Sequence, residues 1–301
     1  MKTEKQIVIH HSADFDGIFC REMARRFYSD NATYIGWDYG DPIPEIPEGA
    51  HITMLDISID GLMGYPKLTW IDHHKTAIEK HGTNIPGYQI DGVSACRLAW
   101  QWFNHEYSPL NPYCHPCDWR LPEKEAFIAR TVSEPWAVRL AGEYDIWDKR
   151  DPDAELFQHG LRSQEITPMH WDFILRPDFT GPDERNSFVS KLLEQGRAIQ
   201  YAKTQENLDI ISNFGFTFQW EGLVFLGCNH ARFNSHLFAD GIKPVHDGLF
   251  GFNWTGDEWR VSLYGVPGKP EIDLSAIAKK YGGGGHKQAC GFKTNKLPFL
   301  T

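Results

Sequence analysis

The sequence of 301 residues contains no long hydrophobic run, few cysteines and no excess of basic residues. Its apolar runs are only a few residues long, whereas a membrane-spanning helix needs about 20 residues. The charged N-terminal segment lacks the apolar core of a secretory signal. The six scattered cysteines are too few for a disulfide scaffold in a chain of this size. We therefore expect a globular, cytoplasmic protein with no membrane partner.

The charge balance narrows the choice of partners. The chain has 40 acidic and 30 basic residues, a formal net charge of −10. Sequence-independent binding of a nucleic-acid duplex relies on basic surface, so we expect no duplex DNA partner. A small anionic substrate is still compatible with this balance, because acidic residues that bind divalent cations contribute less negative charge than the formal count implies.

The hydrophobic pattern predicts an α/β protein whose N-terminal domain has a mostly parallel sheet covered by helices. Short β-rich runs at 7–9, 52–55 and 68–71 alternate with helical patterns, as in such sheets. We assign residues 1–185 to this domain. The proline-rich composition of segment 104–122 indicates an insertion, to which we assign no role. Its Cys114-x-x-Cys117 lacks the second cysteine pair of most zinc sites.

The pattern changes in the last third of the chain. Residues 186–213 are polar and free of proline, which predicts a linker helix. Residues 214–301 then predict a smaller C-terminal α/β domain. It has strand-like runs and one helix capped by Asp273, followed by four consecutive glycines.

Acidic and imidazole side chains follow each predicted strand of the N-terminal domain: His10, Asp14 and Asp16 after the first, Asp56 after the second, and Asp72, His73 and His74 after the third. Ligands of open parallel sheets bind beyond the carboxyl ends of the strands, so we expect these side chains to converge. A further acidic segment containing Asp145 follows a helical stretch. A single aspartate after a strand is usually a turn or cap residue, but a set of this size is not.

Converging carboxylates repel one another and raise one another's pKa unless a cation neutralises them. Aspartate and histidine together are suitable ligands for Mn²⁺, Mg²⁺ or Zn²⁺. With five or six ligands there is room for two ions that share one carboxylate. The sequence therefore predicts a divalent metal centre suited to phosphoryl chemistry.

These motifs resemble those of a known family. His10-x3-Asp14-x-Asp16-Gly17, Asp56 and Asp72-His73-His74 resemble the first three motifs of the DHH phosphoesterase superfamily. Residues 144–147 resemble the fourth motif of its small DHH/DHHA1 oligoribonucleases, the nanoRNases. Gly282–Gly285 followed by His286 resembles the GGGH motif of the DHHA1 domain. The motifs span nearly the whole chain in the order of the family.

The resemblance implies a role for each residue of the centre. One ion would be held by His10, Asp14 and Asp56, and the second by Asp16, Asp56, His73 and Asp145. Mn²⁺ is the usual ion of the family, with Mg²⁺ as the alternative. His74 would face the scissile phosphate, and Asp72 would orient a histidine. We expect the neighbouring His11 to be an ordinary residue at the end of a strand.

The resemblance also implies that Gly283, Gly284, Gly285 and His286 bind the phosphate or terminal nucleotide of the substrate. Glycines allow backbone N–H groups to approach an anion closely. Many family members carry Ser-Leu-Arg-Ser on the preceding strand, whereas this chain has Ser262-Leu263-Tyr264-Gly265 and lacks the arginine. Arg232 is our candidate to replace it, and Arg260 is the alternative.

The predicted function is metal-dependent hydrolysis of short single-stranded RNA or linear dinucleotides to nucleoside monophosphates. A cyclic mono- or dinucleotide phosphodiesterase and a catalytically silent nucleotide sensor remain open. The glycine motif argues against an inorganic pyrophosphatase, and the chain length leaves no room for the extra domains of a RecJ-like exonuclease. The sequence does not decide between a monomer and a homodimer.

Overall fold

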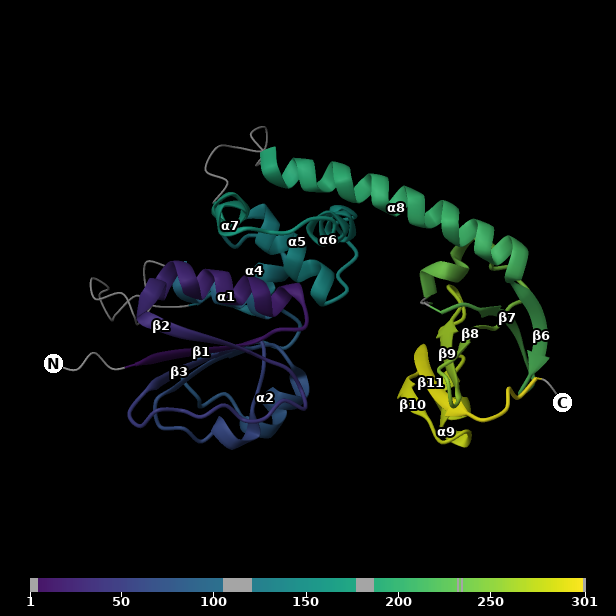
Figure 1. The fold of residues 1–301 in the computed structure, drawn as a ribbon, viewed down its shortest axis with the longest axis horizontal. Coiled ribbons are helices and arrows are strands. Elements are labelled where there is room, and N and C mark those ends of the chain that lie inside the picture. Colours follow the sequence, from purple (N-terminus) through teal and green to yellow (C-terminus); the bar gives the residue numbers. More distant parts are fainter. Residues whose placement is uncertain (1–4, 105–120, 177–186, 232, 234, 300–301) are drawn as a thin grey trace. The chain divides into compact units, whose positions relative to one another are not determined.

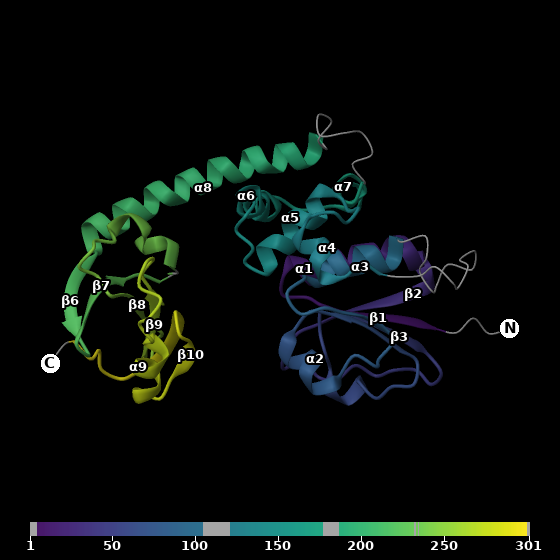
Figure 2. The same ribbon diagram turned by 180° about the vertical axis from the view of Figure 1, so that it is seen from behind.

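The computed structural model describes residues 5–104, 121–176, 187–231, 233 and 235–299 (Figures 1 and 2). The chain divides into two compact units, residues 1–198 and 199–301. The candidate Arg232 and the Cys114-x-x-Cys117 motif lie outside the described residues. No helix in the described ranges is long and apolar enough to cross a membrane.

The first unit contains the predicted parallel sheet. Its strands lie in the order β2-β1-β3-β4-β5, and every neighbouring pair is parallel. They are β1 (Gln6–His11), β2 (Ala32–Trp37), β3 (His51–Leu55), β4 (Leu68–Asp72) and β5 (Gly87–Gln89). The hydrophobic pattern did not predict β2 or β5. Both are edge strands, one mostly half-exposed and the other only three residues long, so neither carries a long apolar run.

Helices cover both faces of this sheet. Alternate residues of each strand face opposite sides, so the buried strands present apolar side chains to helices on each side. Val8 packs into one apolar cluster with Phe19 of α1, whereas Ile7 and Ile9 pack into another with Ala77 of α2. In Figures 1 and 2, α1 and α2 lie on opposite sides of the strands. The helices are α1 (Phe15–Tyr28), α2 (Lys75–His81), α3 (Ala95–Asn104), α4 (Lys124–Ile128), α5 (Trp136–Asp145), α6 (Asp153–Arg162) and α7 (Pro168–Ile174).

A single helix, α8 (Ser187–Phe214), contributes to both units. Near its start, Val189 and Leu192 are buried in the core of the first unit. Near its end, Ile211 packs into a core of the second unit. The linker helix predicted at 186–213 falls on α8. The two units divide within this helix, between residues 198 and 199. The predicted limits of the two domains, at residues 185 and 214, stay a prediction.

The second unit is built on a six-stranded sheet in the order β10-β11-β9-β8-β7-β6, in which only β7 and β8 are parallel neighbours. Helix α9 (Leu274–Lys280) begins at Asp273, whose carboxylate accepts hydrogen bonds from the backbone N–H groups of Ser275 and Ala276. The strands are β6 (Phe216–Trp220), β7 (Leu223–Asn229), β8 (Gly248–Trp254), β9 (Trp259–Gly265), β10 (Gly284–His286) and β11 (Ala289–Thr294). Part of the glycine run is thus a strand paired with β11.

Two glycines allow α6 and α8 to cross in close contact. A Cβ atom on Gly196 of α8 would lie 1.8 Å from the carbonyl oxygen of Leu156 in α6. A Cβ atom on Gly160 of α6 would lie 2.1 Å from the carbonyl oxygen of Leu192 in α8. Backbone atoms cannot move away as side chains do, so any larger residue must push the helices apart.

We predict that Gly196→Ala lowers the free energy of unfolding of the first unit by about 1–3 kcal/mol, the usual cost of overpacking. Urea denaturation followed by circular dichroism measures this change. The matched control is Gln205→Ala on an exposed part of α8, which should change stability by no more than about 0.5 kcal/mol. Equal stability of the two variants would contradict the close crossing.

Candidate metal centre and a glycine-lined pocket

The carboxyl end of the parallel sheet gathers acidic and imidazole side chains from several elements. Three groups of possible metal ligands lie here, with the ligand atoms of each group within 4.8 Å of one another. They are Asp16, His73 and Asp145; His11, Asp14 and Asp56; and Asp56, His73 and His74. Five of the six predicted ligands are therefore brought together, although more than 120 residues separate Asp14 from Asp145 in sequence.

The first group surrounds the imidazole of His73. Its Nε2 atom lies 3.3 Å from Asp145 Oδ2, 3.4 Å from Asp56 Oδ1 and 3.6 Å from Asp16 Oδ2. One neutral imidazole nitrogen and three carboxylate oxygens can surround a divalent cation at this point.

The second group contains His11 in the place that the resemblance implied for His10. His11 Nδ1 lies 3.1 Å from Asp14 Oδ2 and 3.5 Å from Asp56 Oδ2. Asp56 therefore turns one oxygen toward each group, Oδ1 toward His73 and Oδ2 toward His11. A carboxylate in this position could be shared by two divalent cations.

His10 is not brought to either group. It is buried, and its Nδ1 donates a hydrogen bond to the carbonyl oxygen of His11 (2.7 Å). Burial, reinforced by Arg21 and Arg25, lowers its pKa to about 4. Consecutive residues of a strand face opposite sides of the sheet. The motif spacing could not show which of the two histidines faces the aspartates, and His10 was expected in the place where His11 lies.

The local fold explains the Asp-x-Asp-Gly spacing. Asp14 caps α1 and accepts a hydrogen bond from the backbone N–H of Gly17 (3.2 Å). Asp16 accepts hydrogen bonds from the backbone N–H groups of Ala95 and Cys96 at the start of α3 (2.8 and 2.7 Å). A Cβ atom on Gly17 would lie 2.1 Å from the carbonyl oxygen of His11. Only glycine lets α1 begin so close to the end of β1.

Asp56 is held in an unfavourable state. Its side chain is buried and its backbone adopts a left-handed conformation (φ 60°) that non-glycine residues rarely adopt. No described residue donates a hydrogen bond to Oδ1. Burial opposes its ionisation, but the imidazoles of His11 and His73 more than offset this and lower its pKa. A buried anionic oxygen without a donor is costly, and a cation at this position would remove the cost. The residues therefore fit a divalent metal.

The surrounding pKa values show how the centre is neutralised without a cation. Burial, with the charges of neighbouring carboxylates, raises the pKa of Asp145 to about 6 and that of Asp16 above its usual value. Asp14 and Asp56 raise the pKa of His11 to about 11. Burial disfavours the charged form of His73, but Asp56, Asp16 and Asp145 outweigh this and raise its pKa to about 10. A cation would take the place of these imidazole protons.

His74 and Asp72 form a separate pair beside this cluster. His74 Nδ1 donates to Asp72 Oδ1 (2.7 Å), and this contact raises the pKa of His74. Asp72 is fully buried, and the same oxygen accepts the backbone N–H groups of both His73 and His74. Asp72 thus fixes the ring of His74 and leaves its Nε2 atom available on a partly exposed side chain.

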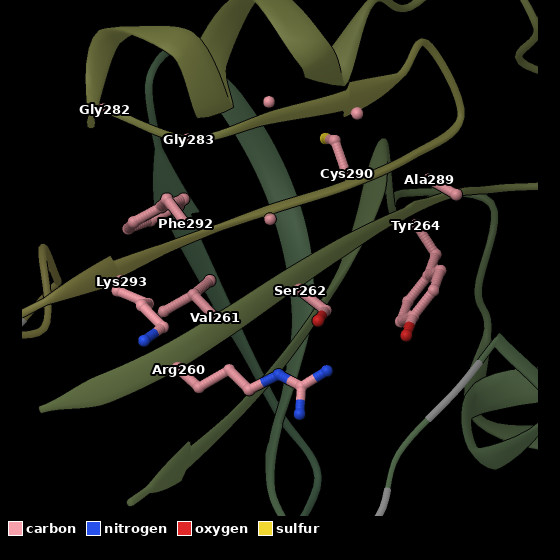
Figure 3. A pocket seen from close by; sticks show the side chains of 13 residues that line it. Arg260, Val261, Ser262, Tyr264, Gly282, Gly283, Ala289, Cys290, Phe292 and Lys293 are labelled. Atoms are coloured by element: carbon pink, nitrogen blue, oxygen red, sulfur yellow. The ribbon is translucent and has the colours of Figure 1, made fainter. Parts of the chain in front are cut away.

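The glycine run lines an open pocket of about 580 Å³ in the second unit (Figure 3). A Cβ atom on Gly283 would lie 2.0 Å from the carbonyl oxygen of Gly291, and Gly285 has φ 129°, so larger residues do not fit there. Gly282–Gly285 lie along the pocket, whereas His286, the last residue of β10, is exposed and is not among its lining residues. Of the predicted substrate contacts, the pocket unites Gly283, Gly284 and Gly285.

The opposite side of the pocket is formed by alternate residues of β9. Arg260, Ser262 and Tyr264 share one face of the strand, and Figure 3 shows their side chains one after another beneath the glycines. No ion pair to Arg260 occurs within the described residues. Lys293, which lies opposite Arg260 on β11, also lines the pocket and pairs with Glu258. The pocket therefore offers an unpaired guanidinium beside backbone that an anion can approach.

Comparison with known proteins gives structural matches only. No family model and no curated protein matches the sequence. A pGpG-specific phosphodiesterase, PggH, from Vibrio cholerae superposes with a TM-score of 0.51 at 16% identity, covering 97% of this chain and 94% of that chain. The DHH domain of a protein described as a member of a family of ribosomal proteins superposes with a TM-score of 0.51 at 14% identity, covering 97% of this chain and 83% of that chain. These likenesses confirm the fold: the chain has the fold of these proteins.

We predict that Asp56→Asn removes the binding of divalent cations. Asparagine keeps the size of the side chain and tolerates the left-handed backbone, so the variant loses the shared anionic ligand without a change of shape. Calorimetric titration with Mn²⁺ measures binding, and thermal unfolding measures its effect on stability. At a cation concentration of 100 times Kd, the wild-type chain should gain about 2.7 kcal/mol, and the variant nothing.

The control is Asp60→Asn, an exposed aspartate four residues away that pairs with Lys80 and His81. It should bind Mn²⁺ as the wild-type chain does. Undiminished binding by the Asp56 variant would rule out a shared carboxylate.

A second prediction separates the two adjacent histidines. His11→Ala should weaken Mn²⁺ binding and lower the number of ions bound, because its Nδ1 lies beside Asp14 and Asp56. His10→Ala should leave the number of ions unchanged and act mainly on stability, since this ring is buried away from the aspartates. The same titration checks both variants, and the reverse result would restore the assignment implied by the motif.

Proposed function

We propose that this chain, which has the fold of a DHH-domain protein, is a metal-dependent phosphodiesterase of the DHH/DHHA1 superfamily that hydrolyses linear dinucleotides or other very short RNA to nucleoside monophosphates. The observation that carries the proposal is the position of Asp56. One buried carboxylate faces two groups of ligands, and one of its oxygens has no hydrogen bond.

Within this proposal, the chain holds two divalent cations, with Mn²⁺ as our first choice and Mg²⁺ as the alternative. His11, Asp14 and Asp56 would hold one ion, and Asp16, Asp56, His73 and Asp145 would hold the other. When bound, such cations neutralise phosphoryl oxygens and lower the pKa of an attacking water.

The other residues of the centre act on the phosphate through hydrogen bonds. Asp72 holds the Nδ1–H of His74, so the ring keeps one orientation and its Nε2–H can donate to a phosphoryl oxygen. A donor fixed in advance stabilises the charge that develops in the transition state without reorganisation. Asp72 is a positioning residue, because it acts through His74.

The glycine-lined pocket supports a nucleotide substrate. Backbone N–H groups near Gly284 and the guanidinium of Arg260 suit a terminal phosphate, and the ring of Tyr264 is placed to stack on a base. Arg260 would thus replace the arginine that is missing at position 264, four residues further along the same face of β9. We prefer a linear dinucleotide because PggH, one of the similar structures, is described as specific for pGpG.

A panel of substrates tests the proposal. Linear dinucleotides, RNA of three to ten nucleotides, cyclic mono- and dinucleotides and pyrophosphate are each incubated with the protein in Mn²⁺, with a chelator control. We expect linear dinucleotides to be hydrolysed fastest and the chelator to abolish turnover. Preferred cleavage of a cyclic nucleotide would identify the alternative phosphodiesterase, and binding without turnover would identify a sensor.

We predict that Asp56→Ala abolishes this turnover, since both cations lose a ligand. Residual activity above about a tenth of the wild-type value would exclude the shared-carboxylate scheme, because losing one charge-assisted contact alone costs about a tenfold change or more. Asp60→Ala serves as the control with full activity expected.

Arg260→Ala should raise KM for a dinucleotide about ten- to a hundred-fold, the usual cost of a lost hydrogen bond to a charged group, with a smaller change in kcat. Steady-state kinetics measure both constants. The control is Lys293→Ala in the same pocket, whose ammonium group is already paired with Glu258 and should matter less. Equal effects of the two variants would argue against a specific role for Arg260.

A further inference from the structure

Arg162, the last residue of α6, packs over two aromatic rings whose neighbours in the chain are proposed metal ligands. Its guanidinium carbon is 5.6 Å from the ring centroid of Phe15 and 5.7 Å from that of Tyr144. Phe15 stands between Asp14 and Asp16 in the chain, and Tyr144 directly precedes Asp145. Both rings are half-buried against the core of the first unit. The rings that hold Arg162 thus belong to residues adjoining three of the proposed ligands.

Arg162 also differs from four other arginines of the first unit, which bind carboxylates. Arg97 pairs with Glu134, Arg130 with Glu143, Arg139 with Asp151, and Arg150 with Asp148. For Arg162 the structure gives two ring contacts and, within the described residues, no acidic partner. A guanidinium that packs over aromatic rings does not use up its N–H groups in those contacts. It can therefore donate to an oxyanion.

The charge of the centre calls for such a group. Asp14, Asp16, Asp56, Asp72 and Asp145 are five carboxylates in one place, and two divalent cations together with the imidazolium of His74 would just balance them. A phosphodiester brings a further negative charge. His74 already shares its charge with Asp72. A cation supplied by the protein and not bound to an acid would lower the cost of bringing the phosphate in.

We propose that Arg162 is a substrate-binding residue that donates a charge-assisted hydrogen bond to a phosphate oxygen at the metal centre, with Phe15 and Tyr144 holding it in position. This rests on the proposed phosphodiesterase function and names a further contact for the same substrate. It also gives the first unit its own phosphate contact, separate from the pocket of the second unit.

The test compares Arg162→Ala with Arg176→Ala. Arg176 is an exposed arginine that follows Leu175, whose carbonyl oxygen accepts from Arg26 near the C-terminal end of α1, whereas the metal centre lies at its N-terminal end. We expect Arg162→Ala to lower kcat/KM for a linear dinucleotide about ten- to a hundred-fold. Arg162→Lys should lie between the wild type and Arg162→Ala, because it keeps the charge but not the planar stacking. Arg176→Ala should match the wild type.

A binding measurement separates this proposal from the proposed function. The affinity of the metal-loaded protein for inorganic phosphate is measured by calorimetry, which needs no turnover, and Mn²⁺ affinity is measured on the same variants. We expect Arg162→Ala to weaken phosphate binding about tenfold and to leave Mn²⁺ binding and the melting temperature within error of the control.

Each outcome decides one proposal. If no dinucleotide is hydrolysed but Arg162→Ala still weakens phosphate binding, the proposed substrate is wrong and the role of Arg162 stands. If the wild type hydrolyses dinucleotides and Arg162→Ala equals Arg176→Ala in both assays, the role of Arg162 is wrong. A lower melting temperature with unchanged phosphate binding would show that the arginine only supports the two rings, and absence of phosphate binding in every variant would overturn the proposal as well.

Discussion

The structure of the first unit depends on one unfavourable arrangement, the gathering of buried carboxylates around Asp56. Burial and mutual repulsion oppose the ionisation of Asp16 and Asp145, and Asp56 adopts a backbone conformation that is rare for its residue type. Without a cation, the protonated imidazoles of His11 and His73 supply the opposite charge. These unfavourable terms meet in a group of side chains that fits a divalent cation, and this is the reason to treat the cluster as functional.

Close backbone packing and helix capping position the elements around the metal centre. Gly17 lets α1 begin directly at the end of β1, and Asp16 caps α3 as well as facing the cluster. Asp72 is buried behind the histidines and fixes His74. The packed parts of the unit therefore hold the ligands in place. Arg162 is exposed, and we propose that it contacts a phosphate. The second unit provides backbone and a guanidinium in a pocket of its own.

Much of the fold could be predicted because local pattern and tertiary environment agree. The runs at 7–9, 52–55 and 68–71 fall in the buried central strands, and Asp273 caps the helix expected after it. The edge strands β2 and β5 were missed because a strand that is half exposed needs no apolar run. The glycines at 284 and 285 lack any strand propensity, and their pairing with β11 depends on a partner strand rather than on their own side chains.

The sequence by itself determined the parallel sheet and the residue types that follow its strands. The carboxyl ends of parallel strands lie at the same edge of the sheet, whatever path the connecting segments take. The sequence could not decide between His10 and His11. Adjacent residues of a strand differ only in the face they occupy, and that face is set by what packs on each side of the sheet. Nor could it find Arg162, since the two rings that hold it come from helices far apart in the chain. Only the folded structure brings them together, because long-range packing has no counterpart in local spacing.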